Sequence, residues 1–248
     1  MIEIEGVFLL ACAIVFVAAV TSGLAGFGLA IISIPPLLLL YEPATVVAVI
    51  KVLTIGTTWI IMVDAWRDIS WRWIARLVPT ALIGLFAGAW LLQVLDADAI
   101  RVIAGSVVFV LALALLTWQP HAVRERRWSV PLLGLVSGTG STAVGLSGPP
   151  VVLYFTLMGV GKETLRATIA TYFVALDLVG LPTLVTQGAV GGDDLWVALA
   201  LAPVAVIGRL VGIRLVRFVS PLAFRRATLG LLLLTGGTSV VMGMAGLA

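Results

Sequence analysis

Three charged side chains lie in the middle of long apolar segments: Lys51, Asp177 and Arg209. A charge in such a place is costly in free energy and usually has a function. Asp177 is too short to extend to a membrane surface, so we expect it either to carry a proton or to pair with a buried cation. Lys51 and Arg209 are expected to neutralise an anion, unless each extends its charged end to the nearest surface.

Two polar, glycine-rich breaks interrupt the apolar segments. The first lies in the stretch Thr21 to Leu40 and the second in Ser137 to Tyr154, and each combines a Ser-Gly step with a later Pro-Pro pair. A helix that ends inside hydrocarbon must be covered by protein or by a water-filled cavity. Matching breaks in two halves of a chain indicate a transporter binding site. The alternative is that they are ordinary kinks and packing seams.

The breaks and their surroundings offer many hydrogen-bond donors and few acceptors. Such a site favours an anion, for example sulfite, a sulfonate or a carboxylate, over a metal ion or an amine. Asp177 is the predicted coupling or charge-pairing residue. The predicted substrate-binding residues are Ser22, Gly26, Gly28, Ser33, Lys51, Ser137, Gly140, Ser141, Thr142, Ser147 and Arg209.

The composition predicts an all-α integral membrane protein. Of 248 residues, 61% are hydrophobic and 11% are charged, which leaves too little polar surface for a soluble globule. The formal net charge of +3 is interpreted as orientation in a membrane by Arg and Lys, and not as a sign of nucleic acid binding. Glu3 and Glu5 make the start of the chain unlike a signal peptide, so we expect it to belong to the mature protein.

Patterns typical of enzymes and metal sites find little support. His121 is the one histidine and falls in a polar linker, Cys12 has no histidine near it, and no span carries HExxH or paired carboxylates. We therefore expect no enzyme, no cofactor and no metal. The alternative is a serine of one break acting as a nucleophile with Lys51.

The chain contains an internal duplication. Pro79, Gly84, Gly88, Ala99 and Arg101 recur 124 positions later as Pro203, Gly208, Gly212, Ala223 and Arg225. A period of this length in a membrane protein indicates duplicated bundles. We expect a first transmembrane repeat at residues 1–120, a basic cytoplasmic linker at 121–128 and a second repeat at 129–248.

The basic residues predict how the repeats cross the membrane. If each break is a hairpin that enters and leaves on one side, 12 basic residues share one face and Arg101 alone faces the other, whereas single crossings divide them 6 against 7. The positive-inside rule selects the hairpins. Each repeat is then a broken-helix hairpin plus three transmembrane helices, 8 to 10 helical segments in all, and the repeats are inverted. The basic face is expected to be cytoplasmic, with both termini outside.

The motifs together resemble the sulfite exporter TauE/SafE family of bacterial membrane transporters. The resemblance rests on Gly26-Phe27-Gly28 followed by Pro35-Pro36, on its repetition from Gly138 to Pro150, and on the paired spans with Pro79 and Pro203. It implies a multi-pass permease of the bacterial inner membrane for sulfite, sulfonates or related organic anions, commonly an exporter coupled to an ion gradient. The chain departs from the glycine-dense form of the family at Leu29-Ala30 and Ser141-Thr142.

We therefore expect a transporter that binds a small anion near the membrane midplane and works by alternating access. The alternatives are a passive anion channel and a membrane scaffold without transport. The expected partners are the anionic substrate and the lipid bilayer, and the sequence leaves open a proton or another coupling ion and a homo-oligomer.

Overall fold

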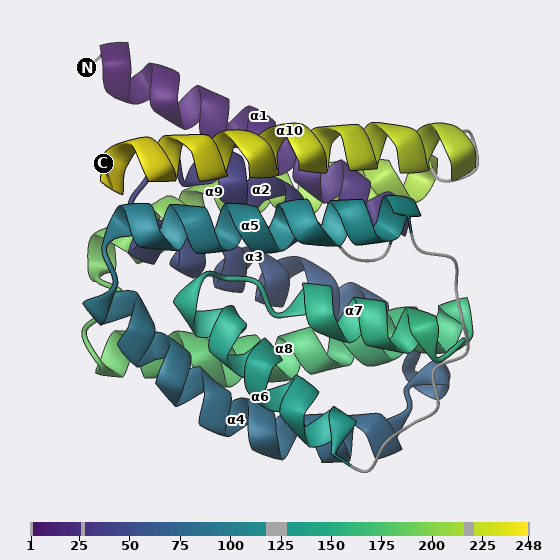
Figure 1. Ribbon diagram of the computed structural model, residues 1–248. Coiled ribbons are helices and arrows are strands. Elements are labelled where there is room, and N and C mark those ends of the chain that lie inside the picture. The colour runs from purple at the N-terminus through teal and green to yellow at the C-terminus, as the bar shows by residue number, and fades with distance from the viewer. Residues whose placement is uncertain (1, 26–27, 118–127, 216–220, 248) are drawn as a thin grey trace.

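The computed structural model describes residues 2–25, 28–117, 128–215 and 221–247, and these parts form a bundle of α-helices (Figure 1). The first half contains α1 (Ile2–Ala25), α2 (Leu29–Leu37), α3 (Pro43–Asp64), the short 3-10 helix η1 (Trp66–Asp68), α4 (Trp71–Val94) and α5 (Ala97–Thr117). The second half contains α6 (Ser129–Ala143), α7 (Gly148–Leu157), α8 (Lys162–Thr186), α9 (Gly192–Leu215) and α10 (Pro221–Leu247).

Each half begins with a hairpin of two helices joined across a break. In the second half, the hydroxyl groups of Ser129 and Tyr154 lie 2.7 Å apart and Ser137 donates to the carbonyl oxygen of Ser147 at 2.6 Å, so α7 folds back along α6. In the first half, α1 packs against α2. Three longer helices follow in each half, as the sequence predicted.

The two hairpins open toward opposite ends of the bundle. Thr45 at the start of α3 donates to Asp194 at the start of α9, and α1 runs parallel to α9, so α1 and α3 begin at one end. α4 and α8 begin at the other end, where Ser70 N–H donates to Thr168 at 3.0 Å. The predicted pair of inverted repeats is confirmed.

Small residues allow the hairpins to pack closely on the opposite repeat. Gly88 of α4 lies against the carbonyl oxygen of Thr139 in α6, and Gly212 of α9 lies in the same way against Val20 in α1. A side chain at either glycine would collide with backbone, which is why the duplicated glycines recur at this spacing. Each hairpin is therefore held by the fourth α-helix of the other half, α4 or α9.

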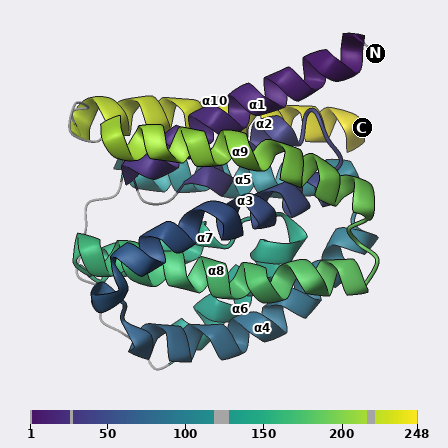
Figure 2. The same ribbon diagram turned by 180° about the vertical axis from the view of Figure 1, so that it is seen from behind.

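Four helices are long and apolar enough to cross a membrane in the described parts of the chain: Gly6–Leu24, Trp71–Val94, Glu163–Thr186 and Gly192–Leu215. Large apolar side chains such as Phe86 and Trp196 project outward, where lipid would contact them. α5 and α10 lie side by side along one face (Figure 1), while α3 and α8 pack together in the centre (Figure 2). The chain is a multi-pass membrane protein.

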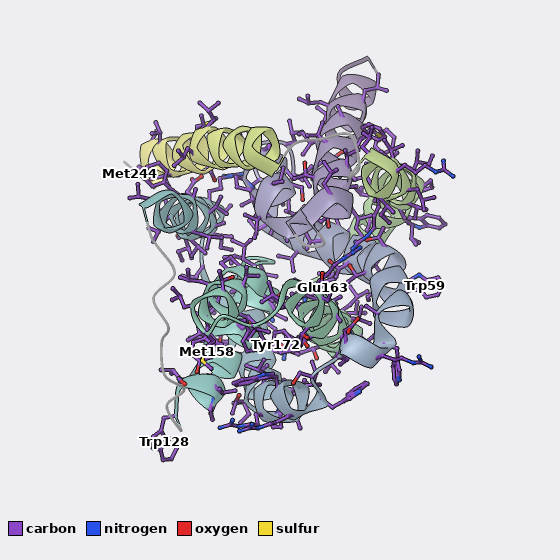
Figure 3. All side chains as sticks on the ribbon, turned by 90° about the vertical axis from the view of Figure 1, so that its right-hand side faces the viewer. Trp59, Trp128, Met158, Glu163, Tyr172 and Met244 are labelled. Atoms are coloured by element: carbon purple, nitrogen blue, oxygen red, sulfur yellow. The ribbon has the colours of Figure 1, made fainter. Side chains whose placement is uncertain are left out.

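One end of the bundle collects most of the basic residues of the described chain. Arg67 and Arg72 lie at η1 and the start of α4, Arg166 lies in the first turns of α8, and Arg214 lies in the last turn of α9. We call this the basic end, and Figure 3 looks onto it. Residues 121–127 of the predicted linker lie outside the described residues. The domain boundaries at 120 and 129 stay predictions.

The two Pro-Pro pairs do not occupy equivalent places in the two hairpins. The interpretation of the two breaks as copies of one motif is therefore wrong for the prolines. Pro35 and Pro36 lie near the end of α2, whereas Pro149 and Pro150 lie in the first turn of α7. A first turn tolerates proline because its N–H groups have no partner within the helix. The breaks themselves do correspond: Gly28 caps the start of α2 as Ser147 caps that of α7.

Candidate functional site

A cavity of about 30 Å³ lies where the two breaks meet in the interior of the bundle. A water molecule needs roughly 10–15 Å³ on this measure, so the cavity has room for about two. Its walls come from both hairpins and from the central helices α3 and α8. The lining residues are Ser22, Gly28, Leu29, Ala30, Ile31, Ile50, Thr54, Thr58, Gly145, Ser147, Gly148, Val152, Phe173 and Asp177.

The short helices α2 and α7 both begin at this cavity. Gly28 has φ 109°, a conformation that favours glycine, and it turns the chain into α2. Ser147 and Gly148 form the matching start of α7. The first N–H groups of a helix have no partner within it and carry partial positive charge. The start of α2 thus brings N–H donors to the cavity. The start of α7 adds the N–H of Gly148, while Pro149 and Pro150 have no N–H to donate.

Lys51 and Asp177 form a buried ion pair beside the cavity. Lys51 Nζ lies 2.9 Å from Asp177 Oδ1 and donates to Ser141 Oγ at 3.0 Å. Lys51 is fully buried and Asp177 is 4% exposed, so the lysine does not extend to a membrane surface. Asp177 lines the cavity, while Lys51 lies behind it. The structure therefore contains the predicted pairing with a cation; a proton-carrying role for Asp177 stays a prediction.

Arg209 is buried one layer away from the cavity. Its side chain is 1% exposed, so it does not extend to the basic end either. Nη1 donates to Thr57 Oγ1 at 2.9 Å and to Thr58 Oγ1 at 3.2 Å, and Thr58 itself lines the cavity. Among the described residues, Nε and Nη2 of Arg209 have no hydrogen-bond partner.

The structure divides the other predicted site residues into two groups. Ser22, Gly28 and Ser147 line the cavity, whereas Gly26 lies outside the described residues. The rest bind within the protein: Ser33 donates to Leu29 O at 2.6 Å, Thr142 to Leu85 O at 2.7 Å, Ser137 to Ser147 O at 2.6 Å and Ser141 to Asp177 at 3.5 Å, while Gly140 O accepts from Leu146 N–H at 2.9 Å. These side chains shape the breaks.

Sequence reasoning missed the threonines of α3. Thr54 and Thr58 line the cavity, and they follow Lys51 by three and seven residues, a spacing that places all three side chains on one helix face. A polar stripe on an apolar helix is the signal that would have found them. Phe173, four residues before Asp177 on α8, was missed because an aromatic residue gives no such signal.

Two inverted repeats, two broken hairpins and a cavity where the breaks meet are an arrangement typical of membrane transporters. Among these transporters, the chain belongs to the sulfite exporter TauE/SafE family, whose family model matches residues 11–238. The resemblance predicted from the sequence motifs is therefore confirmed.

Two relatives carry descriptions of their own. The chain is 26% identical over 217 residues to the "Probable sulfite/organosulfonate exporter TauE" of Cupriavidus necator, covering 86% of this chain and 85% of that protein. It is 26% identical over 180 residues to the "Probable inner membrane transporter protein TsaS" of Comamonas testosteroni, covering 68% of this chain and 72% of that protein. No solved structure matches the chain significantly.

Proposed function

We propose that this protein transports a small sulfur oxyanion, sulfite or an organic sulfonate, across the bacterial inner membrane. Family membership supports a transporter, and one relative is described as a probable sulfite and organosulfonate exporter. The observation that carries the proposal is that α2 and α7, from opposite repeats, both begin at one buried cavity. The start of α2 favours an anion through its free N–H groups and its dipole, and the start of α7 does so through its dipole and the N–H of Gly148.

The charges around the cavity favour the same substrate. The positive charge of Lys51 and the negative charge of Asp177 compensate each other at 2.9 Å, whereas Arg209 has no carboxylate partner among the described residues. The surroundings of the cavity therefore include one uncompensated positive charge, that of Arg209 one layer away, and an anion would interact favourably with it in a medium of low dielectric constant. The hydroxyl groups of Ser22 and Ser147 add donors that an oxyanion accepts.

The apolar part of the cavity would hold the carbon end of a sulfonate. It is lined by Phe173 of α8, Val152 of α7 and Ile50 of α3. A substrate with a charged oxyanion head and a short hydrocarbon group fits a lining that mixes polar and apolar side chains.

Alternating access explains why the cavity is small. At about 30 Å³ it is too small for a hydrated anion, so the walls of the cavity would have to move apart during transport. Because the hairpins open toward opposite ends, rocking one repeat against the other would expose the two helix N-termini to each side in turn. The basic end would face the cytoplasm and both termini the outside.

Transport by purified protein in proteoliposomes tests the proposal. Sulfite, methanesulfonate, sulfate, thiosulfate and acetate are each presented with and without a pH gradient, and current and the uptake of labelled sulfite are recorded. A carrier gives saturable uptake that unlabelled sulfite on the opposite side accelerates. Uptake without such acceleration would indicate a passive channel, and absence of both current and exchange would indicate a scaffold.

A further inference from the structure

Arg209 leaves its most specific binding edge without a partner. Nη1 donates to Thr57 and Thr58, but Nε and Nη2 are buried with no hydrogen-bond partner among the described residues. Nε and Nη2 lie on one edge of the planar guanidinium group, and this edge is the fork that binds two oxygens of an oxyanion at once. A buried donor without a partner is strongly destabilising, so this arrangement needs an explanation.

Arg166 of α8 interacts electrostatically with Arg209. Its Nε is also buried without a partner in the described chain, and its charge acts on that of Arg209. Arg166 precedes Asp177 by eleven residues, about 16 Å along the helix at 1.5 Å per residue, so it lies nearer the basic end than the cavity does. The two arginines carry like charges, and no acidic side chain is bonded to either in the described residues, so they repel each other.

We propose that Arg209 and Arg166 form a second anion subsite, separate from the central cavity and between it and the basic end. This inference rests on the proposed function, because the anion bound there is the transported oxyanion. Nε and Nη2 of Arg209 hold two of its oxygens, Arg166 Nε donates to the anion as well, and the negative charge relieves the repulsion between the two arginines. Thr58 links the subsite to the cavity, since it lines the cavity and accepts a hydrogen bond from Arg209 Nη1.

The subsite makes transport a passage between two binding positions. The anion is first bound at the helix N-termini in the cavity and then transferred to the arginine pair before release at the basic end, or the reverse for import. A carboxylate side chain bonded to either arginine would occupy its binding edge and block this transfer. The emptiness of the fork in the described chain is therefore what lets it accept a substrate.

Calorimetric titration of sodium sulfite into the purified full chain in lipid nanodiscs, without oxygen or chloride, tests the subsite. The wild-type protein is expected to bind two sulfite ions per chain. Arg209→Gln is expected to lose one of them, and Arg209→Lys, which keeps the charge but not the fork, to weaken that event by about tenfold. Arg214→Gln is the matched control, since Arg214 is an exposed arginine on the same helix, and both events are expected to persist.

Arg166→Gln carries the same test at a less buried position, so the proposal stays falsifiable if the Arg209 variants do not fold. It is expected to weaken the same one of the two events. A wild-type protein that binds one sulfite per chain would overturn the second subsite and leave the proposed transport intact. A wild-type protein that neither binds nor transports sulfite or sulfonate would overturn the proposed function, and this inference with it.

Discussion

Lys51 Nζ lies 2.9 Å from Asp177 Oδ1, and this contact joins α3, the third helix of one repeat, to α8, the third helix of the other. α3 and α8 pack together in the centre of the bundle, so the ion pair lies at the interface on which an inverted-repeat transporter moves. Ser141, in the last turn of α6, accepts a hydrogen bond from Lys51 and donates one to Asp177. The charges thus connect both repeats and one hairpin at a single point.

Removing one member of this pair should destabilise the protein far more than removing both. Lys51→Met or Asp177→Leu alone leaves an unpaired buried charge, a cost of about 3–5 kcal/mol, whereas the double variant leaves neither. We expect the double variant to unfold at a higher temperature than either single one, measured by thermal unfolding in detergent. Equal and additive losses from the two substitutions would show that the charges do not interact.

Asp177→Asn should separate coupling from binding. If Asp177 carries a proton during transport, the variant loses accumulation of sulfite driven by a pH gradient but keeps exchange of sulfite for sulfite, because the amide cannot titrate. Both rates are measured in the same proteoliposomes. Accumulation that still follows the pH gradient in the variant would limit Asp177 to its structural pairing with Lys51.

The sequence alone predicted the charged residues and the hairpin topology, but not which residues meet. Lys51, Asp177 and Arg209 could be found because a charge within an apolar span is rare. Their partners could not: Lys51 and Asp177 are 126 positions apart, and pattern within one segment says nothing about packing between segments. The prolines gave a wrong prediction because the two Pro-Pro pairs lie at different ends of their helices: Pro36 lies near the end of α2 and Pro149 in the first turn of α7. To predict Thr58, one would have had to work out which residues of α3 share a helix face with Lys51.

The duplicated glycines should be intolerant of any side chain. In Gly88→Ala the new Cβ would collide with the carbonyl oxygen of Thr139 and the hydroxyl of Thr142, and in Gly212→Ala with the carbonyl oxygen of Val20. Overpacking of this kind costs about 1–3 kcal/mol, so thermal unfolding should shift downward in both variants. Gly56→Ala is the control, since a Cβ there meets nothing within 4 Å. A Gly88→Ala protein as stable as the control would contradict the close crossing of α4 and α6.

Cysteine labelling in intact cells should show which end of the bundle faces the cytoplasm. Replacing Cys12, the one native cysteine, with alanine gives a background free of thiols. Gly161 and Gly192 then offer exposed positions at opposite ends, and a Cβ at either meets nothing within 4 Å. Because Gly161 lies before α8 at the basic end, the positive-inside rule places it in the cytoplasm and Gly192 outside.

We therefore expect a membrane-impermeant maleimide to label Gly192→Cys in whole cells and Gly161→Cys only after the cells are opened. Labelling of opened cells serves as the control for expression and for reactivity of each thiol. The reverse pattern would place the basic end outside and would overturn the orientation proposed for both termini. Labelling of both positions from outside would contradict the crossing of α8 itself, because Glu163–Thr186 joins the two ends as one span.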